Sequence, residues 1–394
     1  MDVISFNLNG QWVQQKELNP NLTLLQYLRD QANLKAAKEG CAGGDCGACT
    51  VLLRTVEHKS DGCFGYQAIN ACITVLGSLD NRYIVTVEGL RARMQDAKNR
   101  DISDTPLHPV QQAMLDHHAS QCGFCTPGIV ASLAALYQNK AGTEAMEDEI
   151  DEALSGNLCR CTGYRPIIDA AKAMHYYPAP VESAPVVQME QGLTSPCFKF
   201  QSNLRTHQHT RLFLPETEVE LKQYLAKHPN ASIWAGGTDL GLEITHAFKV
   251  FDHMISLHKV TSLTQIEENE QVMSLGSMVT YSKAEPYLKR LFPAFSALIE
   301  RIGSKQIRNQ GTFGGNLANG SPIGDTPPVL IALKAKIELA SEAGERTVDV
   351  EAFFKGYKQV DIRPGEYLKS IQIPKLQTNQ FLQVYKISKR REDD

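Results

Sequence analysis

The stretch Cys41-Ala-Gly-Gly-Asp-Cys46-Gly-Ala-Cys49 places three cysteines and three glycines within nine residues, and Cys72 follows later in the chain. The spacing C-x4-C-x2-C with a distant fourth cysteine is typical of the ligands of a plant-type [2Fe–2S] cluster. Glycines in such a loop let the backbone wrap closely and point N–H groups at sulfur. The alternative is a structural zinc site, but zinc is commonly bound by paired C-x2-C motifs. The pattern therefore favours Cys41, Cys46, Cys49 and Cys72 as cluster ligands.

Four further cysteines form two close pairs, each before a segment that is expected to be helical. Cys122 and Cys125 have the spacing C-x2-C, and Cys159 and Cys161 have the spacing C-x-C. Backbone N–H groups and the dipole at a helix start favour negative charge, which the thiolates of a metal centre carry. From the residues alone, both a second iron–sulfur cluster and a zinc site stay open.

The rest of the composition is that of an ordinary globular protein. The chain has 394 residues, of which 42% are hydrophobic, and a formal net charge of −4. This length predicts two or three domains, and the charge argues against nucleic-acid binding. The first residues lack the features of a signal peptide, and no apolar stretch is long enough for a membrane span, so we expect a cytoplasmic protein without a membrane segment. There, grouped cysteines more often bind metal than form disulfides. Cys63 and Cys197 lack partners at ligand spacing and are expected to be structural.

Hydrophobic periodicity changes along the chain. The first 90 residues are rich in predicted strands, at 3–8, 11–13, 50–53 and 83–87, with a helix at 24–30. Four helices are then expected, at 109–118, 128–139, 147–154 and 166–174. The segment 177–196 contains four prolines and predicts a linker. Beyond it, strands and helices alternate to about residue 375, as in an α/β or α+β domain.

Two glycine-rich stretches lie in the second half of the chain. Residues 233–240 predict a strand that runs into a Gly-Gly turn, and the second stretch covers 310–325. Glycine loops let backbone donors approach a pyrophosphate, but they also occur in many ordinary turns. Neither a Rossmann G-x-G-x-x-G motif nor a G-K-[ST] phosphate loop occurs. A dinucleotide held here therefore needs a fold other than the Rossmann fold.

Together, the phrases CAGGDCGACT, QCGFCTPG and GNLCRCTGYRPI resemble the iron–sulfur half of the molybdenum hydroxylases, the family of the xanthine dehydrogenases. This resemblance implies that both cysteine sets hold [2Fe–2S] clusters. It also implies that the set of Cys122, Cys125, Cys159 and Cys161 lies nearer the molybdenum centre.

The phrases WAGGTDLG and TFGGNLANGSPIGD resemble the FAD-binding segments of the same family. By this resemblance, two stretches would cradle the pyrophosphate: Ile233, Trp234, Ala235, Gly236, Gly237, Thr238, Asp239 and Leu240, and Thr312, Phe313, Gly314, Gly315 and Asn316. Asp325 would bind a polar part of FAD, and Leu368 and Lys386 would line the flavin end. Ile302 stands where animal relatives carry an aromatic residue over the flavin.

The resemblance implies a multidomain α+β protein. Its parts would be a β-grasp ferredoxin-like domain at 1–90, a four-helix [2Fe–2S] domain at 91–176, the linker at 177–196, a two-lobed α+β FAD-binding domain without a Rossmann fold at 197–375, and the start of a truncated C-terminal flavoprotein domain at 376–394.

The implied function is that of the electron-transfer subunit of a xanthine dehydrogenase. Electrons would come from a molybdenum cofactor on a large molybdopterin-binding partner, which binds the purine, and would pass through two [2Fe–2S] clusters and FAD to NAD+. No residue of this chain is expected to be catalytic, and the assembly would be a heterotetramer or larger. The alternatives are another molybdenum hydroxylase, acting on an aldehyde or aromatic substrate, and a zinc-stabilised binding protein without a redox role.

Overall fold

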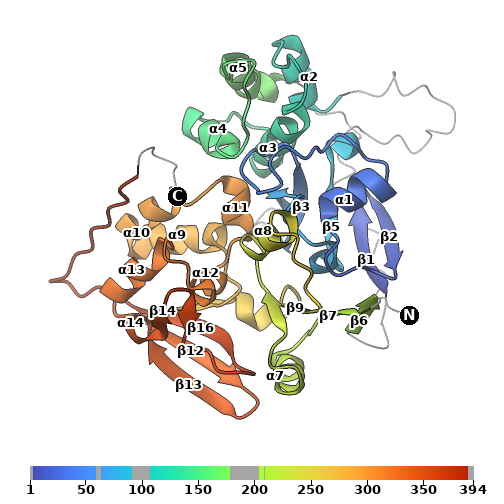
Figure 1. Cartoon of the computed structure of the whole chain (residues 1–394). Coiled ribbons are helices and arrows are strands. Elements are labelled where there is room, and N and C mark those ends of the chain that lie inside the picture. The colour runs from blue at the N-terminus through green and yellow to red at the C-terminus, as the bar shows by residue number, and fades with distance from the viewer. Residues whose placement is uncertain (1–2, 59–63, 91–106, 178–203, 208, 389–394) are drawn as a thin grey trace. The chain divides into compact units, whose positions relative to one another are not determined.

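The computed structural model describes residues 3–58, 64–90, 107–177, 204–207 and 209–388 (Figure 1). These residues form two units. The first comprises Met1–Gln201 and Ile244–Phe248, and the second comprises Ser202–Glu243 and Lys249–Asp394. Apart from residue 177, the predicted linker lies outside the described residues, as do Cys63 and Cys197. No helix in the described part of the chain combines the length and the apolar character that crossing a membrane requires.

A five-stranded mixed sheet forms the first part of the first unit, in the order β2-β1-β5-β3-β4. Its strands are β1 (Val3–Leu8), β2 (Gln11–Lys16), β3 (Thr50–His58), β4 (Phe64–Asn70) and β5 (Tyr83–Val85). The structure confirms all four predicted strands and adds β4, which pairs with β3. The predicted helix near residue 24 is α1 (Leu24–Gln26), which continues as a π-helical turn, Tyr27–Gln31.

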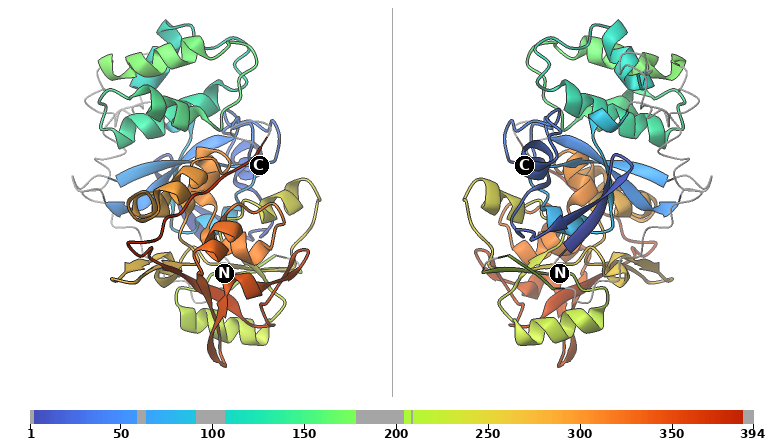
Figure 2. Two further views of the ribbon diagram at one scale, coloured as in Figure 1. Left: turned by 90° about the vertical axis from the view of Figure 1, so that its left-hand side faces the viewer. Right: turned by 90° about the vertical axis from the view of Figure 1, so that its right-hand side faces the viewer.

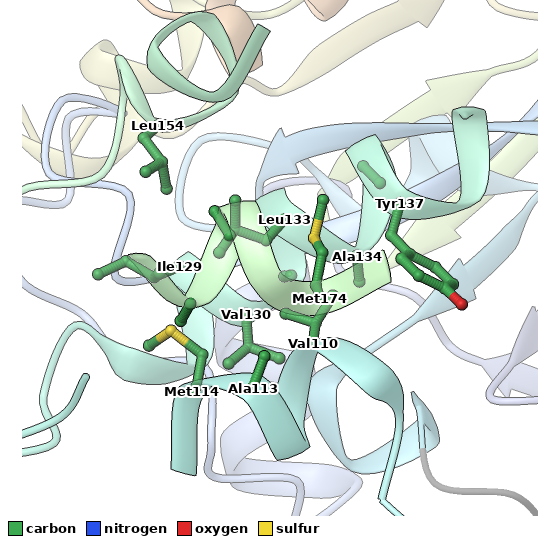
Figure 3. Packing of buried hydrophobic residues seen from close by; sticks show 14 of the residues in the cluster. Val110, Ala113, Met114, Ile129, Val130, Leu133, Ala134, Tyr137, Leu154 and Met174 are labelled. Carbon is green, nitrogen blue, oxygen red and sulfur yellow. The ribbon is translucent and has the colours of Figure 1, made fainter. Parts of the chain in front are cut away.

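Four helices complete the first unit, as predicted. They are α2 (Pro109–Asp116), α3 (Thr126–Asn139), α4 (Glu147–Leu154) and α5 (Arg165–Ala173). Pro166 stands in the first turn of α5, where its missing N–H leaves no hydrogen bond unmade. The helix α3 packs against α2 and α4 and also against β3 and β4, and most of its side chains are buried. In both views of Figure 2 the teal and green helices gather on one side of the blue strands. Figure 3 shows Ile129, Val130 and Leu133 of α3 in this core, among side chains from the neighbouring helices.

The second unit has two lobes, each built on its own sheet. In the first lobe the strand order is β6-β7-β9-β8, with β6 (Leu204–His207), β7 (Thr210–Phe213), β8 (Ser232–Trp234) and β9 (His253–Ser256). This lobe also contains α7 (Glu218–Lys227) and α8 (Leu240–Thr245), although the last residues of α8 cluster with the first unit.

The second lobe is built on an antiparallel sheet in the order β10-β11-β16-β12-β13. The strands are β10 (Ile266–Glu268), β11 (Val272–Gly276), β12 (Lys336–Ser341), β13 (Gly344–Asp349) and β16 (Tyr367–Pro374). A separate pair joins β14 (Phe354–Gly356) to β15 (Gln359–Val360). The helices are α9 (Tyr281–Leu291), α10 (Pro293–Ile299), α11 (Lys305–Gln310), α12 (Phe313–Asn319), α13 (Thr326–Ala332) and α14 (Val350–Phe353). The unit is thus α+β and is not a Rossmann fold.

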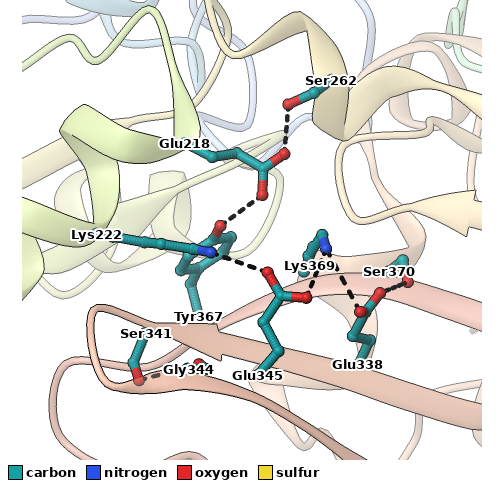
Figure 4. A network of polar contacts seen from close by, with 10 residues as sticks. All are labelled: Glu218, Lys222, Ser262, Glu338, Ser341, Gly344, Glu345, Tyr367, Lys369 and Ser370. Carbon is teal, nitrogen blue, oxygen red and sulfur yellow. Dashed lines mark hydrogen bonds and ion pairs between the residues drawn. The ribbon is translucent and has the colours of Figure 1, made fainter.

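A polar network ties the two lobes together (Figure 4). The hydroxyl of Tyr367 on β16 donates to the Glu218 carboxylate at the start of α7, at 2.6 Å. Lys222 on α7 and Lys369 on β16 both bind Glu345, at 2.9 and 2.8 Å. Hydrogen bonds from Lys369 and Lys222 lower the pKa of Glu345 to about 2. Burial raises the pKa of Tyr367, which keeps its hydroxyl protonated as a donor. The lobes are therefore held in one arrangement by charge-assisted hydrogen bonds.

Candidate cofactor sites

The first cysteine set converges between a loop and the end of β4. The Sγ atoms of Cys49 and Cys72 lie 3.3 Å apart, and both residues are almost fully buried. The backbone N–H groups of Gly43 and Cys46 donate to Cys41 Sγ at 3.3 and 3.4 Å. Hydrogen bonds from the thiols of Cys46 and Cys72 lower the pKa of Cys41. The loop therefore gathers four sulfurs and directs backbone donors at them, as a negatively charged cluster requires.

The second cysteine set joins two separate helix starts. Cys125 immediately precedes α3, whereas Cys161 lies in the loop before α5. The backbone N–H of Phe124, followed by the thiol of Cys161, lowers the pKa of Cys122. Burial, followed by a hydrogen bond with Cys159, raises the pKa of Cys125 to about 12. The thiols therefore meet as pairs, one member from each loop. Cys122 and Cys161 are exposed to solvent.

The pairing of the thiols is informative about the kind of centre. Among the described residues, no three His, Cys, Asp or Glu side chains are arranged to hold a single metal ion. In the second site the thiols stand in two pairs, Cys122 with Cys161 and Cys125 with Cys159. In the first site the contacts form a chain, in which Cys72 contacts both Cys41 and Cys49. Each site thus gathers four thiols, which is the number of thiolates that a [2Fe–2S] cluster requires. The assignment of the eight ligands stays a prediction that the geometry supports.

Two residues that support the second site were missed in the sequence. The Tyr164 hydroxyl accepts the N–H of Cys159 at 2.8 Å and donates to the carbonyl oxygen of Asn157 at 3.1 Å. Tyr164 has a φ of 69°, which is rare for a residue other than glycine. The side chain of Asn157 is buried near the other cysteine site. Their position beside Cys159 and Cys161 was the only signal in the sequence.

The two glycine-rich stretches of the second unit lie against each other. A Cβ atom on Gly236 would stand 2.0 Å from the carbonyl oxygen of Gln310, so the two backbones are in direct contact. Gly237 has a φ of 73° and packs on the indole of Trp234. A Cβ on Gly315 would lie 3.8 Å from Cβ of Ala235. Two predicted cofactor loops, which are far apart in sequence, thus pack against each other with their backbones in contact.

Three of the polar residues predicted to contact FAD make hydrogen bonds or ion pairs at or near the start of α13. The hydroxyl of Thr326 donates to the amide oxygen of Asn316, which links α13 to α12. Lys386 Nζ pairs with the Asp325 carboxylate at 2.9 Å and donates to the carbonyl of Arg301 at 3.0 Å. Only 6% of the Lys386 side chain is exposed. A nearly buried ammonium group beside a carboxylate can serve a polar ligand as donor and acceptor.

The other two predicted residues lie in the hydrophobic core of the second lobe. Leu368 is 5% exposed and pairs with Leu339 across β12 and β16. Ile302 packs against the same core, and its carbonyl accepts a hydrogen bond from Arg308 at 3.2 Å. Arg308, which the sequence analysis missed, is 1% exposed and also donates to Gly303 at 2.6 Å. It stabilises the turn before the second glycine stretch. Its position in the short polar helix α11 did not reveal this burial.

Three family models match the chain in succession. Residues 6–77 match a 2Fe-2S iron-sulfur cluster binding domain, and residues 86–172 match a [2Fe-2S] binding domain. Residues 206–376 match the FAD binding domain in molybdopterin dehydrogenase. The chain therefore carries two [2Fe–2S] binding domains and one FAD-binding domain.

Related proteins match along nearly the whole chain. The xanthine dehydrogenase of Drosophila pseudoobscura pseudoobscura is 32% identical over 443 aligned residues, covering 99% of this chain and 32% of the relative. The xanthine dehydrogenase/oxidase of Mus musculus is also 32% identical, covering 100% of this chain and 32% of the relative. The chain thus spans about a third of the length of these relatives. A solved carbon monoxide dehydrogenase from Hydrogenophaga pseudoflava is 26% identical, with a TM-score of 0.42 over 43% of this chain and 61% of that one.

The order of the domains and the extent of the matches lead to one assignment. Two thiol sites are followed by a glycine-loop site, in the order of the matched domains. The relatives align from one end of the chain to the other. Along its length, the chain fits the iron–sulfur and FAD-binding part of a molybdenum hydroxylase.

Proposed function

We propose that this chain is the electron-transfer subunit of a xanthine dehydrogenase, which takes electrons from a molybdenum centre on a partner and delivers them to NAD+. The reaction of the whole enzyme would be the oxidation of hypoxanthine and xanthine to urate. The observation that carries the proposal is the presence, on one chain, of two four-thiol sites and a glycine-loop site. When bound, the clusters supply one-electron transfer and FAD supplies hydride transfer.

The residues around the thiols would tune the clusters. N–H groups of Gly43 and Cys46 directed at Cys41 Sγ stabilise the more negative, reduced state, which raises the reduction potential. Burial of Cys49 and Cys72 keeps water from that side of the first site. The exposed second site suits exchange of electrons with a partner, because Cys122 and Cys161 lie at the surface.

The second unit would bind FAD between its lobes. The loops 233–240 and 312–316 would cradle the pyrophosphate, since the glycines leave the backbone accessible there. Asp325 would bind a polar part of FAD, and Leu368 and Lys386 would line the flavin end, with Ile302 at the position over the flavin. None of these residues needs to act as a general acid or base.

The proposed partner is a large molybdopterin-binding subunit that also binds the purine, in a heterotetramer or larger assembly. The proposed location is the cytoplasm, where a reducing environment keeps ligand cysteines from forming disulfides. Co-expression with such a subunit should give a complex that reduces NAD+ with hypoxanthine. Turnover only with an aldehyde or an aromatic heterocycle would assign the chain to another molybdenum hydroxylase.

Metal and flavin analysis of anaerobically purified protein tests the cofactors directly. We expect about four irons and one FAD per chain, together with the visible absorbance of [2Fe–2S] clusters. Zinc without visible absorbance would contradict the redox function. Iron without flavin would contradict the FAD site alone.

A matched pair of lysine variants tests the FAD site. Lys386→Met removes the partner of Asp325, whereas Lys375→Met removes a comparable ion pair with Glu268 at 2.7 Å. If Lys386 contacts FAD, its loss should weaken FAD binding by about tenfold, the usual worth of a hydrogen bond to a charged group. Lys375→Met should leave it unchanged, as measured by quenching of FAD fluorescence. Equal retention of FAD in both variants would remove Lys386 from the site.

A further inference from the structure

The two cysteine sites of the first unit are linked through the segment that precedes Cys159. The backbone N–H of Leu158 donates to the carbonyl oxygen of Cys46 at 2.9 Å. Cys46 belongs to the first site, and Leu158 is the direct neighbour of Cys159 in the second. The two predicted ligand loops are therefore in backbone contact, and whatever fixes this contact also fixes the spacing between the sites.

Asn157, one residue earlier, bonds to the first loop through its side chain. Its amide nitrogen donates to the carbonyl oxygen of Gly47 at 3.2 Å and to Thr50 Oγ1 at 3.4 Å. Its amide oxygen accepts from Ser132 Oγ of α3 at 2.6 Å. The residue is 1% exposed. Because burying an amide is costly unless both of its ends are hydrogen-bonded, this side chain is held in one orientation.

The loops are also too close for any side chain to separate them. A Cβ on Gly47 would lie 2.0 Å from the carbonyl oxygen of Gly156, and one on Gly128 would lie 2.1 Å from that of Gly47. Gly47 has a φ of 68°, which glycine adopts without strain. The amide of Asn157 bonds across this close approach, to Gly47 and Thr50 of the first loop.

The backbone of Asn157 supports the second loop at the same time. Its carbonyl oxygen accepts the Tyr164 hydroxyl, which in turn accepts the N–H of Cys159. The N–H of Tyr164 donates to Thr162 Oγ1 at 3.1 Å, which stabilises its left-handed conformation. One residue therefore connects to the first loop by its side chain and to the second by its main chain.

We propose that Asn157 is a positioning residue that sets the separation between the two [2Fe–2S] clusters. The proposal rests on the cluster content of the proposed function. It predicts that loss of the amide changes the relation between the clusters while each cluster is retained. A merely stabilising residue would lower stability without this specific effect.

Electron paramagnetic resonance separates these roles. In protein fully reduced with dithionite, the two clusters are paramagnetic, and their dipolar interaction falls with the cube of their separation. Asn157→Ala should lose or broaden the resolved splitting of the fully reduced state. The g values at partial reduction and the iron content should stay those of the wild type.

Asn139→Ala is the matched control. Asn139 of α3 also bridges helix and sheet, because its amide donates to the carbonyl of Tyr66 on β4 at 2.7 Å and accepts the Tyr66 N–H at 3.0 Å. It makes this bond away from the ligand loops, so its loss should leave the splitting intact. Ser132→Ala removes one bond to Asn157 and is a milder variant, which should broaden the splitting partially.

An unchanged splitting in Asn157→Ala would overturn the proposal, as would an equal loss of splitting in Asn139→Ala. Metal analysis of the wild type precedes these measurements. Fewer than two clusters in the wild type would overturn the proposed function, and this inference with it, whereas two clusters with an unchanged splitting would overturn the inference alone.

Discussion

The two cysteine sites differ in how the chain surrounds four thiols. In the first, a loop on a β-sheet surrounds the sulfurs: Cys49 and Cys72 are 1% and 2% exposed, whereas Cys41 and Cys46 are half-buried. In the second, two helix starts present the sulfurs, and Cys122 and Cys161 are exposed. A sheet with a wrapped loop shields its ligands on several sides, whereas helix starts supply donors from one direction only. The difference shows that one chain can build a shielded and an open site from the same ligand type.

The largest expected effect is the loss of one site without the other. Cys46→Ser removes a ligand of the enclosed site, and iron content should fall from about four to about two per chain. One paramagnetic signal should disappear, while the signal of the second site, at the helix starts, should stay. Serine keeps the size of the side chain, so packing is nearly conserved. Disappearance of both signals would show that the two sites do not fold independently.

A pair of glycine substitutions compares the packing around the two sites. Gly47 and Gly163 have similar φ values, 68° and 66°. A Cβ atom on Gly47 would lie 2.0 Å from the carbonyl oxygen of Gly156, whereas a Cβ atom on Gly163 would have no neighbour within 4 Å. Gly163→Ala should cost only backbone strain, about 1–2 kcal/mol. Gly47→Ala should cost about 1–3 kcal/mol more, because the loops must move apart. Chemical unfolding measures both, and equal costs would contradict the tight packing of the enclosed site.

The stability of the part formed by helices α2 to α5 should decrease in acid, because of His108. His108 is 3% exposed, caps α2 by accepting the Val110 N–H, and has its pKa lowered to about 4 by burial. In the unfolded chain His108 takes up a proton near pH 6.5, whereas in the folded chain it does so only near pH 4. The contribution of neutral His108 to the free energy of unfolding is therefore complete above pH 6.5 and is lost as the pH falls toward 4. The loss should be about 3 kcal/mol.

His108→Asn removes the titrating group and keeps a side chain that caps helices well. The free energy of unfolding should therefore depend less on pH between 6.5 and 4, although its value at neutral pH should be lower. His118→Asn, at an exposed position with a φ of 50°, is the control and should retain the wild-type slope. A slope that both variants share with the wild type would locate the acid sensitivity elsewhere.

The smallest expected effect concerns the surface of the helical part. Lys172 and Glu147 form an ion pair at 2.8 Å, with 45% and 67% of their side chains exposed. Solvent screens such pairs strongly. Lys172→Gln should therefore leave the melting temperature unchanged within error, and both cluster signals intact. A clear drop in melting temperature would mean that the open site depends on its surface charges.

Much of the local structure could be predicted from the sequence. The four helices and the strand β1 follow their hydrophobic periodicity, and the cysteine spacings indicate metal centres. The strand β4 was missed, because Phe64-Gly-Tyr-Gln-Ala-Ile-Asn70 lacks a clear alternation and owes its conformation to pairing with β3. Arg308 was missed for a similar reason, since burial of a charged side chain depends on distant carbonyl groups that sequence spacing does not reveal.

The sequence by itself determined the ligand types, their spacing and the glycines of the loops, because these are local properties of short segments. Only the tertiary structure decided that Cys122 meets Cys161 and that Gly236 lies against Gln310. It also decided that Asn157 bonds to Gly47, 110 residues away in the chain. Contacts of this kind form when segments that are distant in sequence pack together and bury their polar groups in hydrogen-bonded pairs. The free energy of such a contact depends on both partners, and no single segment contains both.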